Sequence, residues 1–259
     1  MTKKESKKEF YIWEGVYRTF KDAPTVGPGF SSDTWARKSL ANMARVLRLT
    51  KKKRAIPEFV VYRESLLPVL VALIPKSKML EIIDFGGNLG QEFISILHAT
   101  NIDPKKIRYT VIEQKDMCDI GNKLFRHDRR IRFRPSLPSP RNSVDIIHIG
   151  STLQYIENWK GLFKALVEFK PTYILFTDLQ AGNIPTYATL QNYYDSKIPA
   201  WFFNIFEIIK EFNNLGYRLI SQSTFRGSFF GKEQDRPQAN LPKKFRLKNS
   251  CNLLFKKVD

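Results

Sequence analysis

The sequence predicts an α/β protein whose mostly parallel sheet is covered by helices on both faces. Three observations predict this class. Strand-like and helix-like segments alternate from residue 79 onward, as βαβ units require. Two strand-like segments, MLEIIDF and YILFTDL, are almost continuously apolar, which is typical of central parallel strands. Near the end, YRLISQS and CNLLFKK have no helix between them, so they are expected to pair antiparallel at a sheet edge.

Residues 1–75 are predicted to form a charged tail and a mainly helical cap on a core that spans residues 76–259. The segment SSDTWARKSLANMARVLRL has the periodicity of a helix, which Ser32 or Asp33 can cap. VYRESLLPVLVALI is predicted as a second helix, strained or broken near Pro68. Trp13 and Tyr17 either fold over a cleft as a lid or cover an apolar face of the core.

The core elements follow in order from the apolar runs and the glycine and proline positions. The expected strands are Met79–Phe85, Arg108–Glu113, Ile131–Arg134, Asp145–Ile149 and Tyr173–Asp178. The expected helices are Gln91–His98, Lys115–Arg126 and Trp159–Phe169. A further helix, WFFNIFEIIKEFNNLG, is expected to end at Gly216.

Composition limits the classes of partner and compartment. The formal net charge of +18 fits nucleic acid, an anionic membrane surface or phosphorylated small molecules, although the basic clusters are scattered and equally fit solvated faces. Cys118 and Cys251 show no CxxC spacing, so we expect no disulfide framework or metal site, and a cytoplasmic location. We expect no secretory signal, and the longest apolar run, at 66–75, is too short to span a bilayer.

The stretch IIDFGGNLG reads as a strand, a tight glycine turn and a helix start. Glycines in such a turn are also common in α/β proteins that bind no nucleotide. Here Asp84 precedes the glycines and no P-loop lysine follows, which disfavours a phosphate ligand and nucleotide hydrolysis. Glu113 ends the next strand, where an acidic side chain can accept hydrogen bonds from ribose hydroxyls. The fourth strand leads into the polar loop GSTLQYI, at an edge where open sheets bind ligands.

These pieces, together with VIEQ, VDIIHIGSTLQYIENW and the closing strand pair, resemble class I S-adenosylmethionine-dependent methyltransferases over about residues 76–259. With WEGVY, VYRES and IPAWFF added, most of the chain resembles a family of bacterial and archaeal methyltransferases often associated with surface-polysaccharide genes. The resemblance implies a Rossmann-like, doubly wound seven-stranded sheet with an antiparallel C-terminal edge hairpin. It also implies S-adenosyl-L-methionine as cofactor, bound by these residues: Asp84, Gly86, Gly87, Asn88, Gly90, Glu113, Gln114, Ser136, Leu137 and Ser151. The third strand ends in RFRPSLPSP, without the acid that often contacts adenine, so Ser136 or the backbone near Leu137 must substitute.

The acceptor side has weaker signals. The chain lacks the [DN]PP[YF] tetrapeptide and any Pro-Cys dipeptide, so the two best-marked routes of nucleic-acid methylation lose support. Asp178, Tyr155 and His148 are the candidate catalytic residues, although His148 can equally be a buried, hydrogen-bonded histidine and Tyr155 a packing residue. Lys197, Pro199 and Trp201 border the expected acceptor loop, where an aromatic ring can stack on a sugar.

The leading hypothesis is therefore methyl transfer to an oxygen or nitrogen of a small molecule, for example a phosphorylated or nucleotide-linked sugar of surface-polysaccharide synthesis. One alternative is an RNA methyltransferase, which the charge favours. Another is a non-catalytic protein that retains the cofactor fold. An NAD-dependent oxidoreductase is disfavoured because the turn reads GGxxG and not GxGxxG.

Overall fold

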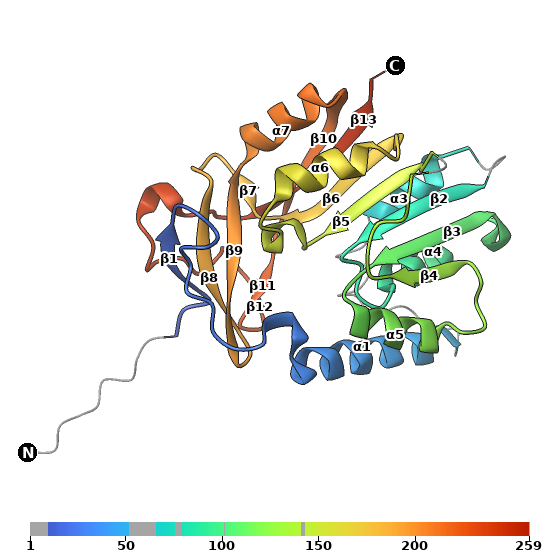
Figure 1. Ribbon diagram of the computed structural model, residues 1–259, viewed down its shortest axis with the longest axis horizontal. Coiled ribbons are helices and arrows are strands. Elements are labelled where there is room, and N and C mark those ends of the chain that lie inside the picture. Colours follow the sequence, from blue (N-terminus) through green and yellow to red (C-terminus); the bar gives the residue numbers. More distant parts are fainter. Residues whose placement is uncertain (1–9, 52–65, 76–78, 101, 141–142, 259) are drawn as a thin grey trace, which may run out of the picture.

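The computed structural model describes residues 10–51, 66–75, 79–100, 102–140 and 143–258. Its main feature is a seven-stranded sheet (Figure 1). The strands, in spatial order, are β10 (Tyr217–Phe225), β13 (Ser250–Lys257), β6 (Tyr173–Leu179), β5 (Ile146–Gly150), β2 (Leu80–Phe85), β3 (Ile107–Ile112) and β4 (Ile131–Arg134). The strands from β6 to β4 pair in parallel, whereas β13 runs antiparallel to both β6 and β10. The predicted fold class is confirmed, and the predicted core strands match within one residue at each end.

Helices cover both faces of this sheet, as Figure 1 shows for α1 on one side and α6 with α7 on the other. Along β2, Ile82 belongs to one hydrophobic cluster and Ile83 to the other, because successive side chains of a strand point to opposite faces. The helices of the first face are α1 (Asp33–Lys51), α3 (Leu66–Leu73), α4 (Gln91–Ala99) and α5 (Lys115–Leu124). Those of the second face are α6 (Trp159–Val167) and α7 (Ile205–Asn214).

The ends of the helices follow local side-chain chemistry. The Oγ of Ser32 accepts a hydrogen bond from the amide of Thr34, so Ser32 caps α1 as predicted. The side chain of Asn204 accepts from the amides of the first turn of α7. That helix ends at Asn214, two residues before the predicted stop Gly216, which has a φ of 81° and leads the chain into β10.

A second, four-stranded sheet lies beside the first and was not predicted from the sequence (Figure 1). In spatial order its strands are β1 (Trp13–Tyr17), β8 (Tyr187–Tyr193), β9 (Ser196–Asn204) and β7 (Ala181–Gly182). The helix predicted to begin at Trp201 was wrong at its start, because Trp201–Asn204 belong to β9. The sequence before Trp201 predicts no strands because Pro199 lies inside β9 and the tight turn at Tyr194 and Asp195 contains no glycine. A short hairpin, β11 (Ser228–Phe229) with β12 (Lys232–Glu233), lies between β10 and β13 in sequence.

The N-terminal part of the chain is joined closely to the core. The predicted helices α1 and α3 are present, and β1 adds a strand to this mainly helical segment. Met43 of α1 and Leu67 of α3 are buried in one cluster with Ile82, so the boundary expected at residue 75 does not separate two hydrophobic cores. Residues 1–9 of the expected tail and 61–65 of the expected second helix lie outside the described residues.

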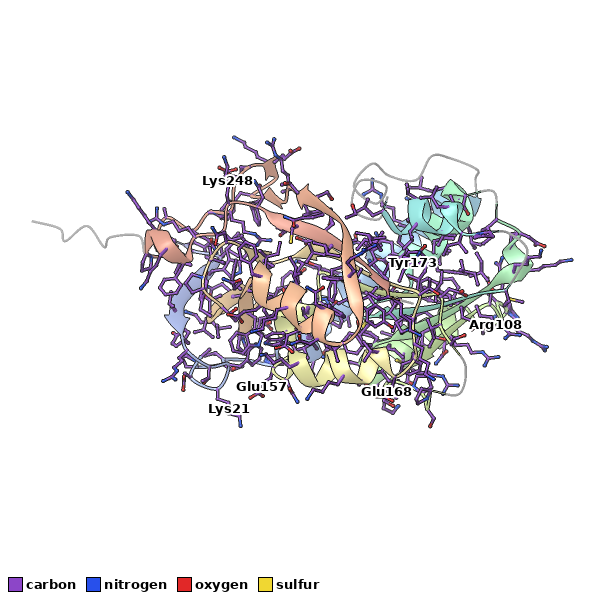
Figure 2. The ribbon with its side chains drawn as sticks, turned by 90° about the horizontal axis from the view of Figure 1, so that it is seen from above. Lys21, Arg108, Glu157, Glu168, Tyr173 and Lys248 are labelled. Atoms are coloured by element: carbon purple, nitrogen blue, oxygen red, sulfur yellow. The ribbon has the colours of Figure 1, made fainter. Side chains whose placement is uncertain are left out.

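The surface of the described part is rich in charged side chains that point outward (Figure 2). Figure 2 places Lys21, from the loop after β1, near Glu157, which precedes α6, and their charged atoms are 4.0 Å apart. Both side chains are largely exposed, so this pair contributes little to stability. Within the described ranges, none of the helices is long and apolar enough to cross a lipid bilayer.

Candidate functional site

The glycine turn joins β2 to α4 at the carboxyl end of the large sheet. Gly90, directly before α4, has a φ of 75°, a conformation that glycine adopts without strain. Asn88 also has a positive φ, 49°, which asparagine tolerates better than most residues. Gly87 is required for a different reason, because a Cβ at this position would lie 2.1 Å from Oδ2 of Asp84. The glycine backbone therefore rests directly on the Asp84 carboxylate.

Asp84 lies wholly inside the protein, with none of its surface exposed. Its Oδ2 accepts a hydrogen bond from the hydroxyl of Tyr109 at 2.7 Å, and its Oδ1 is 2.8 Å from Nδ1 of His148. The predicted acid is thus at the turn, but it is covered by the Gly87 backbone. It can act on a ligand above the turn through its negative charge and not by direct contact.

Glu113 directly follows β3, one residue beyond the end of the strand, and faces the same turn. Its two carboxylate oxygens accept hydrogen bonds from the amides of Asn88, at 3.2 Å, and of Gln114, at 2.9 Å. Burial raises the pKa of Glu113, although these two amides act in the opposite direction. The side-chain amide of Asn88 donates to Ser39 on α1, so α1 extends over the turn.

The residues expected around adenine lie near this acid. The amide of Glu113 donates to the carbonyl of Arg134, which ties the end of β3 to β4. Directly after β4, Ser136 is exposed and Leu137 is half-buried against the second hydrophobic cluster. Gln114 is exposed beside Glu113.

Two strained residues mark the ends of the next two strands. Ser151, after β5, and Asp178, near the end of β6, have φ values of 50° and 49°. Their side chains meet, because the Ser151 hydroxyl donates to Oδ2 of Asp178 at 2.8 Å. Non-glycine residues in this region of conformational space are uncommon and cluster at functional sites. Together with Asn88 after β2, these residues lie at the carboxyl ends of three adjacent strands of one sheet.

Arg236 lies against Asp178 and was missed by the sequence analysis. It comes from the segment between β12 and β13, and its Nη2 is 3.5 Å from Oδ1 of Asp178. Its side chain is only 5 % exposed and also donates to the hydroxyl of Ser250. The guanidinium carbon is between 5.0 and 5.6 Å from the centres of three aromatic rings, those of Trp13, Phe202 and Phe229. No motif surrounds this arginine, and only the packing of three distant segments reveals its partner.

Tyr155 lies in the loop after β5, on the same side as Asp178. Its hydroxyl donates to Gln191 of β8 at 3.0 Å, and its ring packs edge-on against Phe30. Burial raises the pKa of Tyr155, so its phenol stays protonated at neutral pH and can donate a hydrogen bond. Gln154 is buried next to it, and its Nε2 donates to the carbonyl of Ser151.

His148 is placed in the interior and not at the acceptor surface. It is 1 % exposed, and its Nε2 is 2.9 Å from the hydroxyl of Thr177. Burial acts to lower the pKa of His148, but the charge and hydrogen bond of Asp84 and the charge of Glu92 outweigh it and raise the pKa. Among the described residues, Asp84, Glu92 and His148 each have a side-chain oxygen or nitrogen atom that could bind a metal ion, and these three atoms lie within 4.8 Å of one another.

The aromatic and basic residues singled out in the sequence around β1 and β9 contact other residues of the protein. Trp13 is buried edge-on against Phe202, so its position fits a cover of the core. Lys197, Pro199 and Trp201 share one face of β9. The ammonium of Lys197 is 2.7 Å from the carboxylate of Glu14, which links β9 to β1.

The fold is the Rossmann-like fold of S-adenosylmethionine-dependent methyltransferases, as solved structures with similar backbones show. One is a methyltransferase from Clostridium acetobutylicum, with a TM-score of 0.51 and 10 % identity over 85 % of this chain and 99 % of the other. Another is magnesium protoporphyrin IX methyltransferase from Synechocystis with bound S-adenosylhomocysteine, with a TM-score of 0.51 and 11 % identity over 77 % and 83 %. A third is 1,6-didemethyltoxoflavin-N1-methyltransferase from Burkholderia thailandensis, with a TM-score of 0.50 and 10 % identity over 90 % and 94 %. No family model and no curated protein sequence matches this chain.

Proposed function

We propose that this chain is an S-adenosylmethionine-dependent methyltransferase that acts on an oxygen or nitrogen of a small molecule. One observation carries the proposal. A buried carboxylate, a glycine turn and a second carboxylate on the next strand, Asp84, Gly86–Gly90 and Glu113, lie together at the carboxyl end of a methyltransferase fold. Ligands of open α/β sheets bind at this edge.

The donor set fits this cofactor. Glu113 offers carboxylate oxygens to a ribose diol, while Asp84 supplies negative charge beneath the turn. Gly86, Gly87, Asn88 and Gly90 let the backbone approach the ligand. We assign Gln114, Ser136 and Leu137 to the adenine end of the cofactor and Ser151 to its methionine end. We assign α1 to a lid over the turn, which the hydrogen bond between Asn88 and Ser39 holds in place. When bound, the cofactor supplies a methyl group on a positively charged sulfur.

Asp178 is the proposed acceptor-side base. Its carboxylate lies at the end of β6, where Ser151 and Arg236 hold it in place. It would accept the proton of an acceptor hydroxyl or amine as the new bond to carbon forms. Tyr155, kept protonated by burial, donates its proton to Gln191, so its oxygen would orient the acceptor by accepting a hydrogen bond from an acceptor hydroxyl or amine. His148 is better suited to hold Asp84 than to contact the acceptor, since both of its ring nitrogens have partners.

We propose a sugar or sugar nucleotide of surface-polysaccharide synthesis as the acceptor class, in the cytoplasm. Aromatic rings at the acceptor side, among them Phe30 and Tyr155, support a ring-shaped acceptor, on which such rings can stack. Two solved structures with this fold are methyltransferases named for small molecules, a magnesium porphyrin and a toxoflavin precursor. Cys118 and Cys251 are free and buried thiols, which fits a reducing compartment.

The test is transfer of a labelled methyl group from S-adenosylmethionine to the small-molecule fraction of a cell extract, followed by mass spectrometry of the product. We expect one labelled product with the wild-type protein and at least about a hundredfold less of it with Asp178→Asn. The exposed Asp119→Asn variant, which changes only an ion pair on α5, is the matched control and should behave like wild type. Binding of the cofactor without transfer to any fraction would favour a non-catalytic protein instead.

The charge of +18 supports a second candidate, an RNA methyltransferase. This candidate predicts RNA binding whose affinity falls steeply with salt, because bound phosphates release counterions. Filter binding at about 50 and 200 mM salt, compared with labelling of the RNA fraction of the same extract, distinguishes it. Salt-insensitive or undetectable RNA binding removes this candidate.

A further inference from the structure

Four buried polar side chains form a continuous hydrogen-bonded row across four neighbouring strands. The hydroxyl of Tyr109 on β3 donates to Asp84 on β2, which is bonded in turn to His148 on β5. The far nitrogen of His148 meets the hydroxyl of Thr177 on β6. All four side chains are almost completely buried. Polar groups in the middle of a parallel sheet are costly to bury, so such a row calls for an explanation.

The register of the strands places the row on one face. Asp84 and His148 are direct partners in the β2–β5 pair. Tyr109 lies two residues before the β3 partner of Asp84, and Thr177 lies two residues after the β6 partner of His148. Residues two apart share a face of a sheet, so all four side chains point toward the helices that cover the first cluster. Glu92, in the first turn of α4, faces the row from that side.

The negative charges beside His148 favour the protonated form of its imidazole ring. In the described part of the chain, Asp84 and Glu92 are the carboxylates that face the imidazole, and together they raise the pKa of His148 against the effect of burial. In the charged form, Nδ1 donates to Asp84 and Nε2 donates to Thr177. In the neutral form, Nδ1 still donates to Asp84, while the Thr177 hydroxyl turns and donates to Nε2. The ring can therefore lose its proton without losing a hydrogen bond.

We propose that His148 holds a proton that neutralises Asp84 in the free protein, and that binding of a cationic cofactor above the glycine turn releases this proton to solvent. This proposal rests on the proposed function. Only the backbone of Gly87 separates the Asp84 carboxylate from the turn, since a Cβ there would lie 2.1 Å from its oxygen. A positive charge on the other side of Gly87 is thus close enough to take over the neutralising role. The exchange is balanced: one cation arrives, and one proton leaves Nε2 of His148.

The coupling between proton release and cofactor binding predicts how the cofactor affinity changes with pH. Because proton release accompanies binding, the affinity for S-adenosylmethionine rises with pH, up to about tenfold per pH unit below the pKa of His148 in the free protein. S-adenosylhomocysteine lacks the sulfonium charge, so its binding should release a smaller fraction of a proton. Both effects should vanish in His148→Asn, whose side-chain amide can still donate to Asp84 but cannot titrate.

Calorimetry in two buffers with different ionisation enthalpies measures the released protons directly. We expect buffer-dependent heats for the wild type and for the control His98→Asn, which changes an exposed histidine in the last turn of α4. We expect buffer-independent heats for His148→Asn. Cofactor binding by the wild type with equal heats in both buffers and an affinity that does not change with pH would overturn the proposal while leaving the proposed function intact. Failure to bind the cofactor at all would overturn both.

Nuclear magnetic resonance of the three imidazole rings keeps the test independent of any variant at position 148. Variants at His98 and His127 assign the two exposed rings, so that the third signal belongs to His148. We expect this ring to be charged at about pH 6.5 in the free protein and neutral once the cofactor is saturating. A neutral ring in the free protein overturns the proposal. The proposal is also overturned if zinc alone shifts this signal and abolishes cofactor binding, because these two results would identify Asp84, Glu92 and His148 as a metal site.

Discussion

Gly87→Ala tests the contact between the glycine turn and Asp84. The added Cβ would lie 2.1 Å from Oδ2 and 2.4 Å from Cγ of Asp84, whereas carbon and oxygen atoms in contact are normally about 3.5 Å apart. Asp84 cannot turn away without breaking its hydrogen bonds to Tyr109 and His148. Each bond to a charged acceptor contributes about 1.5–3 kcal/mol, so we expect Gly87→Ala to lower the free energy of unfolding by about 3–6 kcal/mol.

The assay is denaturant unfolding combined with calorimetry of cofactor binding. Gly216→Ala is the matched control, because Gly216 has a positive φ but no atom within 4 Å of an added Cβ. This control should cost only the backbone strain of about 1–2 kcal/mol. In the Asp84→Ala background the clash with the carboxylate is removed and only a tight contact of 3.1 Å with the Cβ of residue 84 remains, so Gly87→Ala should then cost clearly less, about 1 kcal/mol. A Gly87→Ala protein as stable as wild type, or equal costs in both backgrounds, would refute the reasoning.

The remaining predictions concern the two carboxylates and the buried charges. Glu113→Ala should weaken S-adenosylmethionine binding about tenfold to a hundredfold in calorimetry, because the ribose hydroxyls lose charged acceptors; an unchanged affinity contradicts its assignment. Asp178→Asn should lower turnover by at least about a hundredfold and leave the cofactor affinity within about threefold, as expected for a base that does not bind the cofactor. Arg236→Met should lower the free energy of unfolding by about 3 kcal/mol, because it leaves Asp178 without its cation, and the double variant with Asp178→Asn should recover part of this loss. The raised pKa of His148 means that the folded state binds the proton more tightly than the unfolded state. Its stabilising contribution is therefore fully present below about pH 6.5 and is lost as pH rises through the folded-state pKa. Unfolding midpoints of the wild type and His148→Asn, compared across this range, should converge at high pH.

The core of the fold could be predicted because its signals are local. Apolar runs fix β2 and β6, and the glycines after Asp84 fix the turn between a strand and a helix. The cofactor half of the site follows from the same logic, since the carboxyl ends of adjacent parallel strands necessarily meet at one edge.

The second sheet and the acceptor half depend on contacts between distant segments. β1 pairs with β8, and no pattern within Trp13–Tyr17 specifies that partner. Arg236 reaches Asp178 from a segment without sequence signals. The three aromatic rings around its guanidinium come from β1, β9 and β11. From the sequence, His148 could be either a catalytic residue or a buried, hydrogen-bonded histidine. Only the register of β2 against β5 shows that its Nδ1 meets Asp84.

A crystal structure of the protein grown with S-adenosylhomocysteine tests the central claim most directly. Our account predicts density for the nucleoside over the glycine turn, with the ribose hydroxyls bonded to Glu113 and the thioether sulfur directed toward Asp178. An empty turn at saturating ligand, or a nucleoside bound away from Glu113, would contradict the account.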